Sequence, residues 1–249
     1  MNISQDHDDH SPKPALVSAL TTEHFALQAT RSSTVMEANG RSQLFLSALT
    51  GSVVALALVA QLDELGRTFT VFALSLLPAV LALGLTTYVR LADLAVQDAF
   101  YARAIGRIRA FYLTIEPSAQ HYWALPAGDD PHAVMRQAGQ RHSIWHHLSH
   151  AATAVAALTA VVTGVLYALI AQLGRASAPP LVGVGAAVVA LVVFVGLMVD
   201  QERRWRRSHR AVPTLFPPSG TSEEEPSPRQ PAVSQDAAAL TNTPDRSQR

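Results

Sequence analysis

The chain has 249 residues, with 19 basic and 19 acidic side chains, a mean hydropathy of +0.16 and no cysteine. The missing cysteines exclude disulfides, thiol catalysis and cysteine-ligated zinc or iron–sulfur clusters. A chain with no net charge also lacks the dedicated basic surface of nucleic-acid-binding proteins, so we expect no nucleic-acid partner.

The first 43 residues precede any long apolar segment. Residues 1–16 are polar and predict a disordered N-terminus. Residues 17–43 have a helical pattern and are expected to run directly into the apolar segment that follows, although Gly40 weakens the join. Acidic residues in this region, and the lack of an apolar core before residue 44, argue against a secretory signal peptide.

Four segments carry no charged residue: 44–62, 68–89, 151–171 and 181–199. An α-helix rises about 1.5 Å per residue, so about 20 residues cross roughly 30 Å of hydrocarbon. These segments are apolar around the whole helix, whereas core helices of soluble proteins keep a polar stripe. The sequence therefore predicts an all-α, polytopic membrane protein, with four transmembrane helices in two hairpins. Residues 17–210 would form this domain.

The basic residues are distributed unevenly outside the spans. Seventeen of the 19 precede the first span, lie between the second and third, or follow the fourth, whereas Arg67 and Arg175 lie in the two short loops. Lys and Arg near span ends are retained on the cytoplasmic side. We therefore expect both termini and the helical segment 90–150 in the cytoplasm, and the protein in a bacterial inner (plasma) membrane.

A heptad pattern follows the second span. Its positions are apolar or aromatic apart from one carboxylate: Leu91, Leu94, Asp98, Tyr101, Ile105, Ile108, Tyr112 and Ile115. The pattern predicts that the span-two helix continues to about Ile115, ends at Glu116 and Pro117, and packs as a coiled coil on another helix. A carboxylate in such a seam requires a basic partner, so Asp98 should have one.

Three arginines share this stretch: Arg103, Arg107 and Arg109. We interpret them as a solvated basic face that helps to fix topology. The alternative is attraction to anionic lipid headgroups, worth about 1 kcal/mol per basic residue near the surface. Further along, Asp130 is a plausible N-cap with Pro131 in the first turn, so a long helix is expected to begin there and to continue into the third span.

Residues 142–150, HSIWHHLSH, place four histidines beside the third span. On a helix, His142 and His150 are about 12 Å apart along the axis, so one helix supplies at most two ligands to an ion. Catalytic zinc usually takes three protein ligands and a water. Four residues of the same segment could add ligands: His121, Asp129, Asp130 and His132. We therefore expect no metal and no cofactor. The candidate ligands for a metal, were one bound, are His142, His146 and His150.

Tryptophan and arginine flank the third and fourth spans. Trp145 and Trp205 are amphipathic side chains of the kind found where hydrocarbon meets lipid headgroups. Trp205 stands within a basic cluster that we interpret as a stop-transfer signal and interface anchor: Arg203, Arg204, Arg206, Arg207 and Arg210.

The third span contains an uninterrupted row of small residues: Ala152, Ala156, Ala160, Gly164 and Ala168. Small residues let two helix backbones approach closely, which drives helix association in lipid. The row serves packing within the chain, or association in a homo-oligomer or with a membrane partner protein. Two other spans contain shorter rows of small residues. Span one has Ser47, Gly51 and Ala55, and span four has Gly183 and Ala187.

Residues 211–249 are rich in Pro, Ser and Glu and predict a disordered tail. The spans contain no Asp, Glu, Lys, Arg or His. Proton-coupled transport, which needs ionisable groups at membrane depth, is therefore disfavoured.

Two runs, ATRSSTVMEANGRSQLFLSALTGSVVALALVAQ (29–61) and YARAIGRIRAFY (101–112), resemble an uncharacterised family of multi-pass membrane proteins of high-GC actinobacteria. The resemblance covers about residues 25–200 and implies the topology without an activity. The hairpins with helical extensions are also similar in outline to the SLATT-type membrane effectors of bacterial conflict systems, a resemblance that implies a pore.

Three functions remain open at this point. The first is a non-enzymatic scaffold or partner subunit that associates through small-residue helix packing. The second is an oligomeric pore lined by small and hydroxylated faces. The third is a metal-dependent enzyme at the membrane surface that uses the histidines of residues 121–150.

Overall fold

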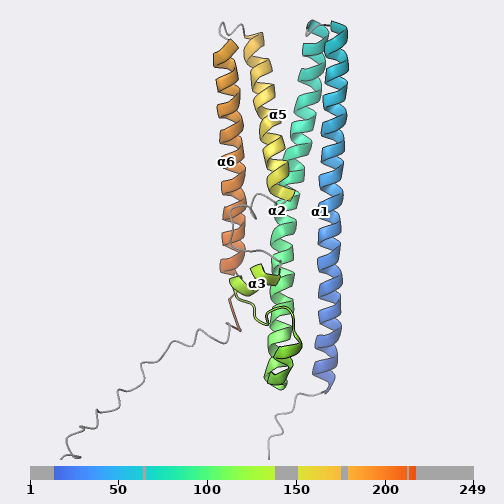
Figure 1. Ribbon diagram of the computed structural model, residues 1–249, viewed down its shortest axis with the longest axis vertical. Coiled ribbons are helices and arrows are strands. Elements are labelled where there is room, and N and C mark those ends of the chain that lie inside the picture. Colours follow the sequence, from blue (N-terminus) through green and yellow to red (C-terminus); the bar gives the residue numbers. More distant parts are fainter. Residues whose placement is uncertain (1–13, 64–65, 138–150, 175–178, 212, 217–249) are drawn as a thin grey trace, which may run out of the picture. The chain divides into compact units, whose positions relative to one another are not determined.

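The computed structural model describes residues 14–63, 66–137, 151–174, 179–211 and 213–216. Within these ranges every regular element is a helix (Figure 1). In chain order they are α1 (Pro14–Asp63), α2 (Arg67–Ile115), the 3-10 helix η1 (Pro117–Tyr122), α3 (Pro131–Gln137), α5 (Ala151–Leu173) and α6 (Pro179–Ala211). The expected all-α fold class is confirmed.

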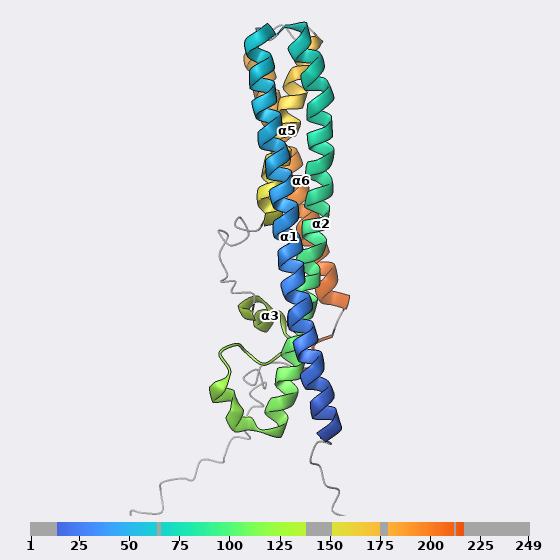
Figure 2. The ribbon, with the colours of Figure 1, turned by 90° about the vertical axis from the view of Figure 1, so that its right-hand side faces the viewer.

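The four long helices α1, α2, α5 and α6 are each long and apolar enough to cross a membrane. Each contains one of the four uncharged segments. Both hairpins form as predicted: α1 packs on α2, and α5 packs on α6 (Figure 1; Figure 2). The chain is therefore a polytopic helical membrane protein by length and composition of its helices.

Two of these helices continue far beyond their uncharged segments. α1 begins 30 residues before its segment, and α2 continues 26 residues past its own. We call residues 14–43 of α1 and 90–115 of α2 the stalk. The helix runs through Gly40 without a break, and α2 ends at Ile115, as predicted. Glu116 takes an extended conformation (φ −139°, ψ 90°), which is the conformation favoured before a proline.

α2 packs along α1 in the stalk, where part of the predicted seam is buried, whereas Ile115 at its end is 39% exposed. Leu91, Leu94 and Ile105 are each no more than 3% exposed. Near the far end, the hydroxyls of Thr21 and Tyr112 are 3.0 Å apart and share a hydrogen bond. Heptad spacing thus predicted several of the buried residues of α2, and the coiled coil itself stays a prediction.

α2 and α5 form the centre of the membrane part, and α1 and α6 flank them. α2 contacts α1 and α5 extensively, and α5 contacts α6. Phe45 of α1, which is fully buried, fills the space beside Gly84 and Thr159, where α2 meets α5. The outward faces of α1 and α6 are apolar and exposed, as at Leu58 and Leu191, which fits contact with hydrocarbon.

Two predicted boundaries lie at the edge of the described residues. α3 begins at Pro131 with Asp130 as its cap, as expected, and is described as far as Gln137. Its predicted continuation to the third span lies in residues 138–150, outside the described residues. The tail was expected to be disordered from residue 211. Residues 213–216 are instead held by hydrogen bonds, because they meet a loop far away in the sequence.

Candidate functional site

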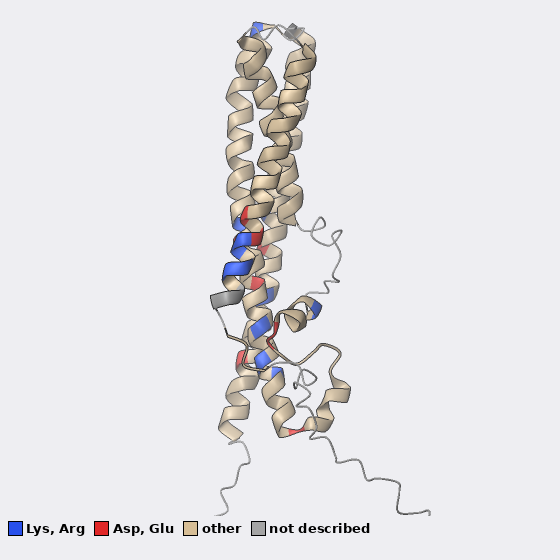
Figure 3. Ribbon diagram, turned by 90° about the vertical axis from the view of Figure 1, so that its left-hand side faces the viewer, with Lys and Arg blue, Asp and Glu red and all other residues tan. Residues whose placement is uncertain are grey.

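Charged side chains gather in the stalk and at its boundary with the spans, whereas the bundle beyond them is almost uncharged (Figure 3). We call this boundary layer the junction and define it by five residues: Glu37, Arg90, Asp93, Asp200 and Arg204. The junction involves three helices, α1, α2 and α6, and its charges are in ion pairs.

Glu37 ties α1 to α2. Arg90 donates to both of its carboxylate oxygens, from Nε at 2.9 Å and from Nη2 at 3.0 Å. Arg41, one turn along α1, adds a third hydrogen bond at 2.9 Å. Bidentate Arg–carboxylate pairs restrict the relative orientation of their two helices more than a single hydrogen bond does.

Arg204 ties α6 to α2. Its Nη1 donates to Asp93 of α2 at 2.8 Å, and its Nε donates to Asp200 of α6 at 2.7 Å. Just inside the span, the Tyr88 hydroxyl donates to the carbonyl oxygen of Leu197. These contacts give the uncharged hairpins a polar connection at one level, although half-exposed pairs each contribute at most about 1 kcal/mol.

Asp98 has the basic partner that the seam required. Arg31 of α1 donates to its two oxygens at 2.7 and 3.2 Å. Both side chains are about one-quarter exposed. Because each carboxylate of the junction and Asp98 accepts from an arginine, we assign these charges a structural rather than an acid–base role.

A second polar centre lies further down the stalk, where Asp129 is completely buried. Its carboxylate accepts from Arg107 Nε at 2.7 Å and from the backbone N–H groups of Leu215 and Phe216 at 2.9 Å. Burial alone would raise the pKa of Asp129, but the backbone donors and Arg107 outweigh it and lower the pKa below its ordinary value.

The surroundings of Arg103, Arg107 and Arg109 show that their interpretation as a solvated basic face is wrong. Arg107 is bonded to Asp129, Arg103 is 6% exposed, and Arg109 is half-buried, so the three arginines do not form a solvated surface. From the sequence, Asp129 is a candidate only as a supplementary metal ligand. No periodic signal connects it to residues 213–216, because its donors are backbone groups 86 and 87 positions away.

The small-residue row of α5 is used within the chain. Ala152, Ala156 and Ala160 are at most 5% exposed. A Cβ at Gly164 would lie 2.8 Å from the Ala186 carbonyl oxygen of α6, and Ala168 at the end of the row is partly buried. The shorter row of α1 faces outward instead, since nothing lies within 4 Å of a Cβ at Gly51. Gly183 of α6 is equally open.

The predicted interface anchors have different positions. Arg203 and Arg207 are exposed, and Arg206 pairs with Glu202 at 2.6 Å. Trp205, by contrast, packs on Ala99, Ala102 and Val134 of the stalk and α3. Trp145 lies outside the described residues, as does the side chain of Arg210.

The candidate metal ligands His142, His146 and His150 also lie outside the described residues. In the part of the chain that is described, no three His, Asp or Glu side chains gather in a way that would hold a metal ion. Asp130, one of the supplementary ligands considered, caps α3 by accepting the N–H groups of His132 and Ala133.

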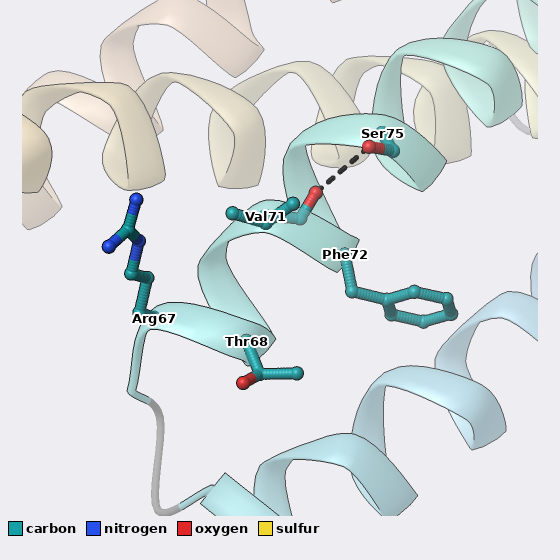
Figure 4. A pocket seen from close by; sticks show the side chains of 5 residues that line it. All are labelled: Arg67, Thr68, Val71, Phe72 and Ser75. Atoms are coloured by element: carbon teal, nitrogen blue, oxygen red, sulfur yellow. Dashed lines mark hydrogen bonds between the residues drawn. The ribbon is translucent and has the colours of Figure 1, made fainter.

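A shallow pocket of about 490 Å³ opens at the start of α2, at the opposite end of the bundle from the stalk. Its lining is shown in Figure 4: Arg67, Thr68, Val71, Phe72 and Ser75. The Ser75 hydroxyl donates to the Val71 carbonyl at 2.9 Å. With one charged side chain in its lining, the pocket offers no acid–base pair.

Comparisons with protein-family models, with curated proteins and with solved structures give no match to this chain.

Proposed function

We propose that the protein is a non-enzymatic membrane scaffold or partner subunit that recognises another protein through its stalk. The observation that carries the proposal is an apolar face of α1 beyond the span. Phe25 is 68% exposed and Met36 is 71% exposed. The two residues are 11 positions apart, which places them on the same side of an α-helix.

Lipid does not explain the exposure of Phe25. Phe25 lies 19 residues before the uncharged segment, or about 28 Å along the helix axis. Exposed apolar side chains gathered on one face of a soluble surface are typical of protein-binding sites. The ion pairs at Glu37 and Asp98 support the same role, because they hold α1 against α2 and keep this face in a defined orientation.

We also propose that the stalk and both chain ends lie in the cytoplasm of a bacterial cell, because 17 of the 19 basic residues precede, separate or follow the hairpins on that side. Reporters fused after Arg249 and inserted at Arg175 would then report opposite compartments; the same compartment for both would contradict this orientation.

The scaffold proposal is tested by photo-crosslinking in the native host. A photoreactive phenylalanine analogue at position 25 should give discrete protein adducts, because this side chain faces a partner. The matched control is position 23, where Glu23 is exposed and lies on another side of the same helix. Position 54, on the lipid-facing side of α1, is a second control.

Equal adduct patterns at positions 23 and 25, or adducts at position 54 alone, would contradict recognition through the stalk. A ladder of self-adducts at position 25 would identify the partner as further copies of this chain, and a homo-oligomer would then replace a separate partner protein.

An oligomeric pore is the second candidate. It is favoured by the outward face of α1, where Ser47, Thr50 and Gly51 are exposed, because several copies could place these small and hydroxylated residues around a channel. A pore within one copy is disfavoured, since Phe45 is fully buried between α1, α2 and α5.

A further inference from the structure

Asp129 and Arg107 contact main-chain atoms of the segment that follows α6. Asp129 accepts the N–H groups of Leu215 and Phe216, and Arg107 Nη2 donates to the Pro213 carbonyl oxygen at 2.6 Å. The two side chains are also bonded to each other at 2.7 Å. Together they bind two N–H donors and one carbonyl acceptor within four consecutive residues.

Pro213, Thr214 and Leu215 are exposed in this arrangement, and Phe216 is partly buried. The Leu215 side chain is 58% exposed, although its backbone N–H is bonded to a fully buried carboxylate. The ligand is therefore recognised through its backbone. Such a site accepts different sequences, provided that the two donor positions are not proline.

The loop that carries Asp129 is held rigidly on α2. Gly128 donates its N–H to the Gly106 carbonyl of α2 at 3.3 Å. A Cβ at Gly106 would lie 1.9 Å from the Gly128 carbonyl oxygen, and Gly128 has a φ of +145°, which side-chain-bearing residues rarely adopt. Two glycines thus permit the close approach that places the Asp129 loop against α2.

We propose that Arg107 and Asp129, with the loop formed by residues 123–130, make a binding site for the main chain of a short peptide segment, and that residues 213–216 occupy it as the chain's own ligand. The site is distinct from the apolar face around Phe25. A peptide from another protein can bind to this site only if it displaces residues 213–216. The segment therefore competes with any such peptide.

The occupancy of the site is measured first, by hydrogen exchange of the full-length protein in detergent. The amides of Leu215 and Phe216 should exchange at least tenfold more slowly than in the free peptide of residues 211–220. Asp129→Asn should remove this protection while the amides of α2 keep theirs. Glu116→Gln, in the neighbouring loop, is the matched control, because Glu116 bonds to Ser118 and not to the segment.

Binding of a separate peptide is measured next. The full-length variant Leu215→Pro/Phe216→Pro lacks both donors, so its site should be vacant. A fluorescein-labelled peptide of residues 211–220 should then bind this variant saturably, and addition of Asp129→Asn should weaken binding at least tenfold. The wild-type chain should bind the peptide more weakly than the vacated variant, because its own segment competes.

Three results would overturn the proposal: free-peptide exchange rates at Leu215 and Phe216 in the wild-type chain, no binding of the peptide to the vacated variant, or binding that Asp129→Asn leaves unchanged. If Asp129→Asn also exposes the amides of α2, Arg107→Gln replaces it in both measurements, and the same three results decide.

Discussion

At the scale of single residues, Asp129 shows how a buried carboxylate can be kept charged. Its side chain is inaccessible to solvent, yet its pKa is lowered, because backbone N–H groups and Arg107 together outweigh the cost of burial. The charged form is therefore the one that binds residues 213–216. Protonation weakens the bonds that hold this segment.

The pH at which the segment is released follows from the direction of this shift. A carboxylate whose pKa is depressed by binding contributes stability above its ordinary pKa and loses it as the pH falls through the lowered value. The ordinary value for Asp129 is 3.8, so we expect the segment to stay bound from neutral pH down to about 4 and to leave below 3.8.

The Phe216 amide resonance of a 15N-phenylalanine-labelled chain, assigned with Phe216→Leu, reports this release. It should be constant above about pH 4 and move to its free position below 3.8. In Asp129→Asn it should already be at the free position at neutral pH. A midpoint above 3.8 would mean that burial, and not the donors, determines the pKa of Asp129.

At the scale of helices, the small-residue row of α5 sets how closely α5 and α6 approach. At Gly164 the nearest atoms to an added Cβ are the Ala186 carbonyl oxygen at 2.8 Å and the Ala190 Cβ at 3.1 Å. A larger side chain would have to push backbone rather than a flexible side chain. The contact is therefore sensitive to a single methyl group.

We expect Gly164→Leu to separate α5 from α6 and to lower the free energy of unfolding in detergent by about 1–3 kcal/mol, as overpacking does. Gly183→Leu makes the same change on α6, where nothing lies within 4 Å, and should change stability by less than about 0.5 kcal/mol. Thermal unfolding followed by circular dichroism measures both. Equal losses would show that the row does not control the packing of this hairpin.

Much of this element-level arrangement can be predicted from the sequence. Uncharged length predicted the four spans, and heptad spacing predicted several buried residues of α2, such as Leu91 and Leu94. Glu116 and Pro117 marked the end of α2 at Ile115. The position of Asp98 predicted a basic partner, which is Arg31. These features are periodic or local. The residues involved are neighbours on one helix or face the next helix of a hairpin.

The contacts that could not be predicted join distant segments through irregular backbone. Nothing in the pattern around Asp129 distinguishes it from Asp130, which caps α3. Trp205 has the composition of an interface anchor but packs on Val134, because α6 passes beside the stalk. Such contacts depend on where a loop folds back, and loop conformation has no sequence period.

At the scale of the whole molecule, the positions of the four helices in the bundle bear on the choice between a scaffold and a pore. α2 and α5 are central, yet all four helices carry exposed apolar side chains, as at Val71 of α2 and Val165 of α5. The spans of α1 and α6 are the least buried of the four, so copies that assemble in the membrane have the most free surface on these two helices. The central helices are already packed by their own small residues and by Phe45.

We expect liposomes containing the purified protein to show no conductance above protein-free liposomes, because the junction charges are paired and one copy has a filled centre. If copies do form a pore around α1, Gly51→Leu should abolish conductance without affecting folding, since it enlarges an open face. Gly40→Leu, outside the span and equally open, is the matched control. Conductance that is lost in Gly51→Leu alone would favour the pore over the scaffold.

The pairing of charges within the first hairpin has a consequence for how the chain is made. Glu37 and Arg90, like Arg31 and Asp98, all belong to α1 and α2, so these bonds need no residue beyond Ile115. Translation proceeds from the N-terminus, and early units can fold while the ribosome is still extending the chain. The first half can thus assemble during synthesis. The bond between Arg204 and Asp93 must wait for α6, and the bonds from Leu215 and Phe216 to Asp129 must wait for the segment that follows it.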